Sequence, residues 1–283
     1  MRVFTPIARV ISLAVFGTVL SGNSYATLLS DFTAAGNLPS DIQPTVANFR
    51  VALGGGLNPN TAAHFADGRR EINWDGVPDG FSDPNPFPGN FFNGSTPGRA
   101  RGVVFNPVGT TTGFEVSSNA ASGEPVAYGF PNDFQVFSPE RLFRTVNGNQ
   151  FDLLFFSPAD QITGALTDGF GMVYTDADFG GLPVLDFFNA QGGLLHSITG
   201  LATANFGLGF VGSVFDRAEV ARVRVTIGGP GDPLNPNASD AVVMDDFIYG
   251  EPQPVPEPGT LALLLAGAVF FMQRRMSIAA RAY

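Results

Sequence analysis

Arg222-Val223-Arg224-Val225-Thr226-Ile227 alternates polar and apolar side chains without interruption. Successive side chains of a β-strand point to opposite faces, so this run predicts a strand with one face in solvent and the other in a core. Strands of this kind are typical of antiparallel sheets with one covered face, whereas the buried strands of βαβ folds are apolar throughout. The stretch therefore favours an all-β fold.

Short strand-like runs recur on both sides of this segment, separated by residues that favour turns. They cover residues 69–76, 102–105, 113–117, 151–156, 169–175, 184–188, 194–198, 206–215 and 241–249. Asn147-Gly148 predicts a hairpin turn before the run at 151, and the Gly-containing loop 189–193 predicts a second hairpin. About ten short strands with abundant glycine and proline predict an antiparallel β-sandwich.

One helix is expected near the start of the domain. Ile42, Val46, Phe49 and Leu53 recur at helical spacing, and Gly54-Gly55-Gly56 follows them. We expect a short helix from Asp41 to Leu53, with Asp41 as its N-cap residue.

Composition excludes several classes of function. Between Asp31 and Glu251 the chain has 10 arginines and 24 acidic residues, a formal charge of −14, and the whole chain has no lysine. So acidic a surface repels phosphate backbones, which argues against a nucleic-acid partner and makes divalent cations more plausible. The absence of cysteine excludes disulfides, thiol nucleophiles and Cys-zinc sites.

No catalytic signature stands out, so we expect a protein without enzymatic activity. The chain has neither an H-E-x-x-H nor a G-x-S-x-G motif, and its histidines, His64 and His196, are far apart. A glycosidase needs two facing carboxylates, and sequence spacing cannot show which acidic residues face each other. An enzyme that acts on polysaccharide therefore remains an alternative.

Asp245 and Asp246 lie inside an apolar strand-like run, Val242 to Tyr249. Strand alternation places them on opposite faces, so a core on either face buries one carboxylate. A buried carboxylate needs a cation, an arginine or backbone N–H donors. Hard oxygen ligands favour Ca²⁺ over softer metals. A salt bridge to Arg69 or Arg70, or exposure at a strand end, would be the alternatives to calcium.

This last strand, of the form apolar-Asp-Asp-apolar, resembles the final strand of secreted jelly-roll modules, which include carbohydrate-binding modules. The resemblance implies a structural calcium shared between Asp245 and an acidic residue of the first strand, Glu71 or Asp75. The candidate metal ligands are thus Glu71, Asp75, Asp245 and Asp246. Trp74, the only tryptophan, is either a core residue or a platform for sugar rings.

The N-terminus predicts export. Arg2 and Arg9 flank the apolar segment Val10 to Leu20, and Ser24-Tyr25-Ala26 follows with small residues at the positions that signal peptidase reads. This order is typical of a secretory signal peptide at residues 1–26, handled by the Sec machinery and cut after Ala26.

The C-terminus has three parts: Val255-Pro256-Glu257-Pro258-Gly259, the apolar run Thr260 to Met272, and Gln273-Arg274-Arg275. About 13 apolar residues fall short of the roughly 20 that span a bilayer as a helix. The segment resembles the PEP-CTERM tail, which implies transient contact with the inner membrane of a Gram-negative bacterium and removal by an exosortase. The residues that carry the resemblance are Val255, Pro256, Glu257, Pro258, Arg274 and Arg275.

The sequence thus predicts a signal helix (1–26), a jelly-roll-like β-sandwich (27–251) and a sorting tail with a short apolar helix (252–283). We expect an exported protein of the cell surface or extracellular matrix with a structural or interaction role. A carbohydrate-binding module for exopolysaccharide is the first alternative, and the polysaccharide-active enzyme is the second.

Overall fold

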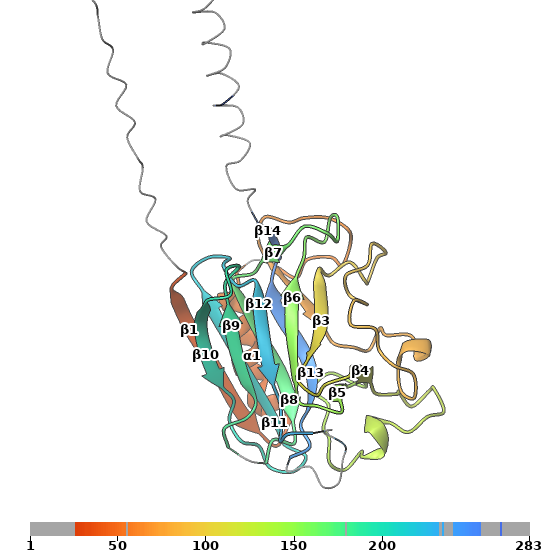
Figure 1. The fold of residues 1–283 in the computed structure, drawn as a ribbon. Helices are drawn as coiled ribbons and strands as arrows, with labels where there is room; N and C mark the ends of the chain where they lie inside the picture. The colour runs from red at the N-terminus through yellow and green to blue at the C-terminus, as the bar shows by residue number, and fades with distance from the viewer. Residues whose placement is uncertain are drawn as a thin grey trace, which may run out of the picture.

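Two antiparallel sheets packed against each other make up the computed structural model, which describes residues 26–54, 56–178, 180–231, 234, 240–255 and 267 (Figure 1). The larger sheet contains, in order, β1 (Leu28–Gly36), β11 (Leu208–Phe215), β8 (Gly169–Thr175), β13 (Val243–Gly250), β5 (Phe143–Val146) and β4 (Gly113–Val116), and β2 (Arg69–Ile72) also pairs with β13. The smaller sheet contains β10 (Leu194–Thr199), β9 (Val184–Phe188), β12 (Arg222–Thr226), β6 (Gln150–Phe155) and β3 (Val103–Val108). The predicted antiparallel β-sandwich is confirmed.

Short elements complete the described chain. β7 (Ala165–Leu166) pairs with β14 (Gln253–Pro254), and single turns of 3₁₀ helix occur at η1 (Asp79–Phe81) and η2 (Ala127–Gly129). The predicted signal helix and the apolar helix of the tail lie outside the described residues. Among the described residues, no helix is long and apolar enough to cross a membrane.

The predicted strands are present, but one predicted hairpin is wrong. β9 and β10 form the hairpin expected around residues 189–193. The Asn147-Gly148 turn instead carries the chain from β5 in the larger sheet to β6 in the smaller one. Asn147 has the left-handed backbone (φ 61°) that the dipeptide favours, so the turn was predicted correctly and the pairing was not. The sequence patterns did not predict β1 or β5.

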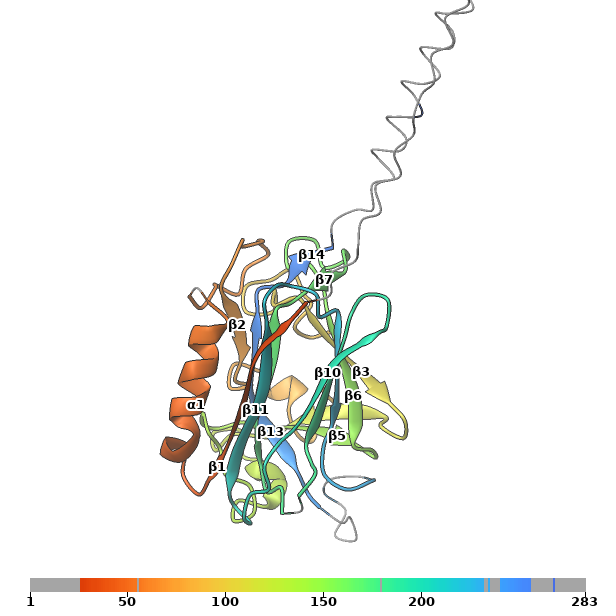
Figure 2. The same ribbon diagram turned by 90° about the vertical axis from the view of Figure 1, so that its left-hand side faces the viewer.

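Helix α1 (Pro39–Ala52) covers the outer face of the larger sheet (Figure 2). Its buried face is the predicted one, with Ile42, Val46 and Phe49 fully enclosed. Phe49 sits above a pair of opposed glycines, Gly212 of β11 and Gly171 of β8, where a Cβ atom on either would come within 3.0 Å of its ring. The missing side chains therefore let the helix approach the sheet closely.

The expected N-cap of this helix is wrong by three residues. The helix starts at Pro39, a position where proline's missing N–H costs nothing, and Leu38 is the N-cap residue. Asp41 occupies the third helical position, where its Oδ2 accepts the backbone N–H of Leu38 and of Asn37, both at 2.9 Å. The carboxylate still satisfies free N–H groups, but from within the first turn.

The main core lies between the two sheets and is dominated by phenylalanine. Its centre is Trp74, which is 1% exposed and stacks on Phe143 with ring centroids 4.2 Å apart. Four more phenylalanine rings surround the indole: Phe87, Phe92, Phe105 and Phe247. Burial of so much aromatic surface stabilises a domain that has no disulfide.

The two ends of the described domain lie together. β1 begins and β14 ends at the same, upper end of the sandwich in Figures 1 and 2. The loops that follow β8, precede β11 and precede β13 lie at the opposite end. The fold therefore gives the molecule an end from which both termini depart and an end that faces away from them.

Candidate functional site

Asp245 and Asp246 occupy a β-bulge in β13. Met244 pairs with Tyr174 and Phe247 with Met172, so two residues of β13 lie opposite the single residue Val173 of β8. The inserted residue breaks the alternation of side chains. The prediction that the two carboxylates lie on opposite faces is therefore wrong, since both reach the hydroxyl group of Ser138, at 3.3 and 2.6 Å.

Asp245 is completely buried and is held by backbone groups. Its Oδ2 accepts the N–H of Phe137 at 2.6 Å and that of Ser138 at 3.1 Å, and its carbonyl accepts the indole N–H of Trp74 at 2.8 Å. Burial, and next the neighbouring Asp246 carboxylate, raise the pKa of Asp245 well above its ordinary value. The side chain thus fastens the 137–138 loop to β13.

Asp246 is the second buried carboxyl group of the bulge. Burial raises the pKa of Asp246 to about 6, although the Ser138 hydroxyl and the Arg50 guanidinium partly oppose the shift. Arg50 Nη2 lies 3.5 Å from Asp246 Oδ2. Two adjacent buried carboxylates repel each other when both are ionised, so the pair retains a proton at pH values where an exposed aspartate has lost it.

The other two predicted ligands lie on either side of this pair. Glu71 of β2 accepts from Arg50 Nη2 and Arg69 Nε, both at 2.6 Å. Burial opposes ionisation of Glu71, but these arginine contacts outweigh it and lower its pKa. Asp75 accepts the N–H of Arg141 at 3.1 Å, and burial raises its pKa.

These carboxylates are bonded to protein donors, which does not fit a metal site. Among the described residues, no three acidic or histidine side chains are arranged so that they could hold a metal ion. Calcium binding stays a prediction. The exposed-carboxylate alternative is wrong, because Asp245 is 0% and Asp246 is 4% exposed. The salt-bridge alternative named the wrong arginines. Arg50 pairs with Asp246, whereas Arg69 pairs with Glu71 and Arg70 with Glu251.

Arg70 forms a buried ion pair that the sequence did not indicate. Its Nε and Nη2 lie 2.7 and 2.8 Å from the two carboxylate oxygens of Glu251, and Nη1 donates to the carbonyl of Ala100 at 2.6 Å. Both side chains are almost completely enclosed. The pair fastens β2 to the residue that follows β13, four positions before Val255.

Trp74 is a core residue. Its indole lies among phenylalanine rings and its N–H is bonded within the protein. The interpretation of Trp74 as a platform for sugar rings is therefore wrong.

A Ser-Asp-His cluster joins the two sheets at one side of the sandwich. Asp31 of β1 accepts the hydroxyl of Ser213 at 2.6 Å and lies 3.0 Å from Nε2 of His196 on β10. The aspartate is the central member of this cluster. Activation of a serine nucleophile requires a histidine between the serine and the acid. This cluster has the aspartate in the middle, so we interpret it as a structural contact that holds β1, β10 and β11 together.

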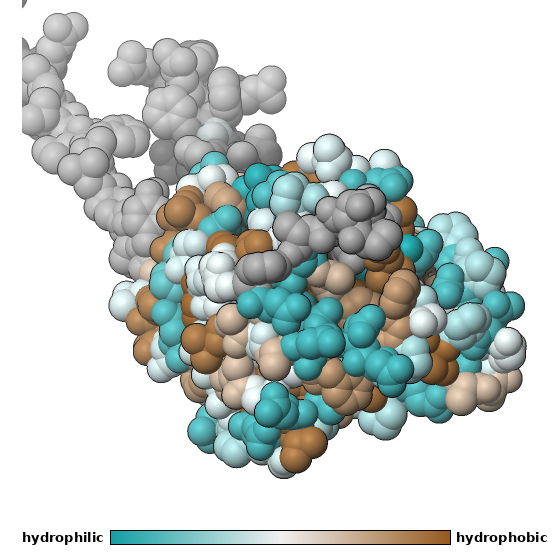
Figure 3. Space-filling model, turned by 90° about the horizontal axis from the view of Figure 1, so that it is seen from below, coloured by the Kyte–Doolittle hydropathy of each residue, from teal (hydrophilic) through white to brown (hydrophobic). Residues whose placement is uncertain are grey.

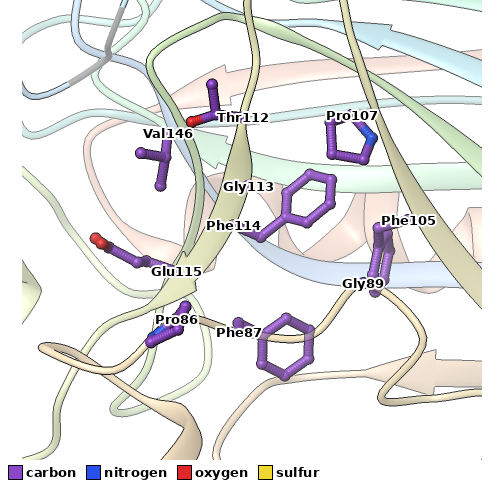
Figure 4. Close-up of a pocket in the computed structure, with 10 residues that line it drawn as sticks. All are labelled: Pro86, Phe87, Gly89, Phe105, Pro107, Thr112, Gly113, Phe114, Glu115 and Val146. Carbon is purple, nitrogen blue, oxygen red and sulfur yellow. The ribbon is translucent and has the colours of Figure 1, made fainter.

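A pocket of about 450 Å³ opens between β3 and β4, the edge strands at the other side of the sandwich. Figure 4 shows the rings of Phe87, Phe105 and Phe114 converging on it with Pro107, while Glu115 points away. Glu115 is the one titratable residue among the ten that line the pocket, and it pairs with Arg144. The pocket therefore combines aromatic rings with polar surface and has no pair of facing acids.

A second recess, of about 500 Å³, lies at the lower end of the molecule beside η2. Its walls are largely apolar and include Val126, Phe134 and Phe206. Figure 3 looks onto this end, where hydrophobic and hydrophilic residues are interspersed over the part that is not grey. A catalytic site requires several polar side chains that point to one place. The residues that line this recess include only two polar side chains, Gln135 and Glu140.

The outer face of the smaller sheet carries a straight row of polar residues. Strand register places Ser197, Asp186, Arg224, Asp152 and Asn106 side by side across all five strands. Arg224 forms a bidentate pair with Asp152, at 2.9 and 3.1 Å. In the next row the guanidinium of Arg222 lies 3.8 Å above the ring of Phe188. Within the described residues, helix α1 lies on the other sheet (Figure 1).

Comparison with known proteins identifies the C-terminal segment. Neither a curated protein nor a solved structure matches the chain significantly, so the resemblance of the body to jelly-roll modules stays a prediction. Residues 254–275 match the model of the PEP-CTERM protein-sorting motif. The chain therefore carries the C-terminal signal of an exosortase substrate, which supports export and sorting to the surface or exterior of a bacterial cell.

Proposed function

We propose that this chain is an exported β-sandwich protein that an exosortase releases or attaches at the surface of a Gram-negative cell, where it has a structural or interaction role in the extracellular matrix. The observation that carries the proposal is the sorting motif at residues 254–275. The Sec machinery and the exosortase are its processing partners. A signal peptide at residues 1–26 supplies the export step.

The arrangement of the ends supports this role. Because β1 begins and β14 ends at the upper end of the sandwich, a chain held at the membrane by its tail directs its lower end away from the membrane (Figure 2). The acidic pair at the bulge is buried and bonded to a loop, which suits stability better than catalysis. A role without enzymatic activity is therefore preferred.

The test is expression in a Gram-negative host with and without its exosortase. With the enzyme, the extracellular or surface form should yield no peptide from Leu261 to Arg275 by mass spectrometry. Without it, the tail should remain on a membrane-associated chain. Replacing Pro256, Glu257 and Pro258 by alanine should reproduce the second result, and Pro230→Ala, in an exposed loop, should not. Full-length protein in the cytosol would overturn the proposal.

Binding of a neutral exopolysaccharide is the second candidate, and the polar row on the smaller sheet favours it. Asp152, Asp186 and Arg224 are held in place by neighbouring side chains, so their hydrogen-bonding groups are preorganised. The guanidinium of Arg222, which is stacked on the ring of Phe188, adds hydrogen-bond donors beside them. The acidic charge of the body disfavours a polyanionic glycan.

A glycan array with the exported protein tests this second candidate. Binding of neutral glycans that Arg224→Gln abolishes and Arg217→Gln retains would support it. Arg217 lies in the loop after β11 and serves as the matched control. No binding on the array would remove the candidate and leave the sorting proposal unchanged.

A further inference from the structure

The start of the described chain is bonded to two carboxylates. The backbone N–H of Thr27 donates to Asp216 Oδ1 at 2.9 Å, and the N–H of Asp216 donates to the carbonyl of Thr27 at 3.0 Å. The N–H of Ala26 donates to Glu219 Oε2. Both acids lie in the loop that follows β11, the strand against which β1 pairs.

A neutral amide N–H satisfies only a small part of the hydrogen-bonding capacity and none of the charge of these carboxylates. Each amide nitrogen donates one hydrogen and carries no net charge, whereas each carboxylate has two charged oxygens. Arg217 lies 3.2 Å from Glu219 and is the neighbouring cation. A positive charge on the nitrogen of Thr27 would lie 2.9 Å from Asp216, where a charge-assisted hydrogen bond is stronger than a neutral one.

Cleavage after Ala26 creates such a charge at this atom. In the uncut chain the nitrogen of Thr27 is a peptide nitrogen. When signal peptidase hydrolyses the Ala26–Thr27 bond, water adds its hydroxyl to the carbonyl carbon of Ala26, which leaves as a carboxylate with the signal peptide. The nitrogen of Thr27 takes up protons and becomes an α-ammonium group with three donors.

We propose that Asp216, with Glu219 beside it, is the receiving site for the α-ammonium group that cleavage after Ala26 creates on Thr27. The inference rests on the proposed export and on that cleavage site. It goes beyond both, because it assigns to the loop after β11 a ligand that is absent until the chain has been processed.

The consequence is a processed chain whose edge strand is held more firmly. β1 pairs on one side only, with β11, and most of its residues are exposed, including Leu29 at 59%. An exposed apolar edge strand is prone to fraying and to pairing with other chains. The ion pair fixes Thr27, the residue that directly precedes β1, at the point where cleavage removes the core contact that Ala26 makes in the uncut chain.

The composition of the chain makes a clean experiment possible. Because the sequence has no lysine, the α-amine is the only aliphatic amine of the processed protein. Reductive methylation with ¹³C-formaldehyde therefore labels this group alone and keeps its charge, and its pKa can be read by NMR titration. The charged groups that face it are Asp216, Arg217 and Glu219.

Processed protein is isolated after export, and its first residue is established by mass spectrometry. We expect Thr27 to be the first residue, and the pKa of its labelled amine to fall by at least about half a unit in Asp216→Asn relative to wild type. Asp67→Asn, at an exposed aspartate elsewhere, should leave that pKa unchanged. Acetylation, which removes the charge, should speed amide hydrogen exchange in β1 several-fold in wild type and much less in Asp216→Asn.

The possible outcomes distinguish a failure of the inference about Asp216 from a failure of the proposed export and sorting. A first residue other than Thr27 overturns the inference but leaves export and sorting intact. A start at Thr27 with the same amine pKa in wild type and Asp216→Asn confirms the cleavage site and overturns the receiving role of Asp216. Exchange rates measured on the same samples show whether Asp216→Asn has loosened β11 as well, because a general loss of structure would affect both strands.

Discussion

Arg70 and Glu251 form a bidentate ion pair in which both side chains are almost completely buried, with nitrogen-oxygen distances of 2.7 and 2.8 Å. The residues are 181 positions apart in the chain. Glu251 directly follows β13 and lies just before the segment that matches the sorting motif, so the pair closes the domain at the end from which the tail departs. The contact makes the boundary between domain and tail a structured one.

Removing one partner of this pair should strongly destabilise the domain. Arg70→Met leaves the Glu251 carboxylate buried without its cation, which typically costs about 3–5 kcal/mol. The midpoint of urea unfolding measures the loss. Arg217→Met, at an arginine 41% exposed in its side chain, should cost less than about 1 kcal/mol. Equal losses in the two variants would show that burial does not set the strength of the Arg70 pair.

The approach of helix α1 to the sheet depends on Gly212. In Gly212→Ala the new Cβ would lie 2.9 Å from Phe49 Cε2 and 2.8 Å from the Cα atom of Gly171, which is backbone and cannot rotate away. Overpacking of this kind costs about 1–3 kcal/mol, which thermal unfolding would detect. Gly113→Ala, where a Cβ meets nothing within 4 Å, is the control and should not destabilise. If Gly212→Ala left the unfolding temperature unchanged, helix α1 would have to be able to move away from the sheet without loss of stability.

Local patterns in the sequence predicted local structure well. The alternation at residues 222–227 gives β12, with Val223 and Val225 fully buried. The spacing of Ile42, Val46 and Phe49 gives the buried face of α1. These patterns report the environment of single elements, because core and solvent select the side chain at each position.

Pairings between distant elements could not be read in this way. The bulge at Asp245 and Asp246 is defined by the spacing of β8, the partner strand, and alternation within β13 alone predicts the opposite arrangement. The turn at Asn147 has hairpin residues, yet its two strands belong to different sheets. A salt bridge from the acidic pair to Arg70 was one of the predicted alternatives, but Arg70 pairs with Glu251. Each of these depends on which strands become neighbours.

Calcium should have little effect on stability. Glu71, Asp75, Asp245 and Asp246 are bonded to arginine, serine or backbone donors, so an ion would have to displace existing bonds. We expect melting temperatures with calcium and with EGTA to agree within about 1 °C. An ion present at about 100 times its Kd would add about 2.7 kcal/mol, or roughly 5–10 °C for a domain of this size. A rise of that size, abolished by Asp245→Asn and retained in Asp67→Asn, would establish the calcium site.

Stability should fall as the pH rises from about 4 to about 7, because several buried carboxyl groups, Asp245 among them, keep their protons to higher pH than in the unfolded chain. Burial raises the pKa of Asp168 and of Asp246 to about 6, and burial together with the nearby Asp178 raises that of Asp176 to about 7. In the unfolded chain these groups titrate near 3.9. Between the two values the folded state binds more protons, so its advantage is complete below about pH 4 and is lost through about pH 6 to 7.

Asp246→Asn tests this slope at the bulge. The amide keeps an acceptor for the Ser138 hydroxyl and has no titration, so the decline in unfolding free energy between pH 4.5 and pH 7.5 should shrink, by at most roughly 1.4 kcal/mol for each unit of pKa shift removed. Urea midpoints at the two pH values measure the decline. Glu71 acts in the opposite sense, because its pKa is lowered from the ordinary value of 4.5, so its contribution is lost only as the pH falls below about 4.5. The exposed control Asp67→Asn should retain the wild-type decline, and an unchanged decline in Asp246→Asn would show that the carboxyl pair at the bulge does not carry it.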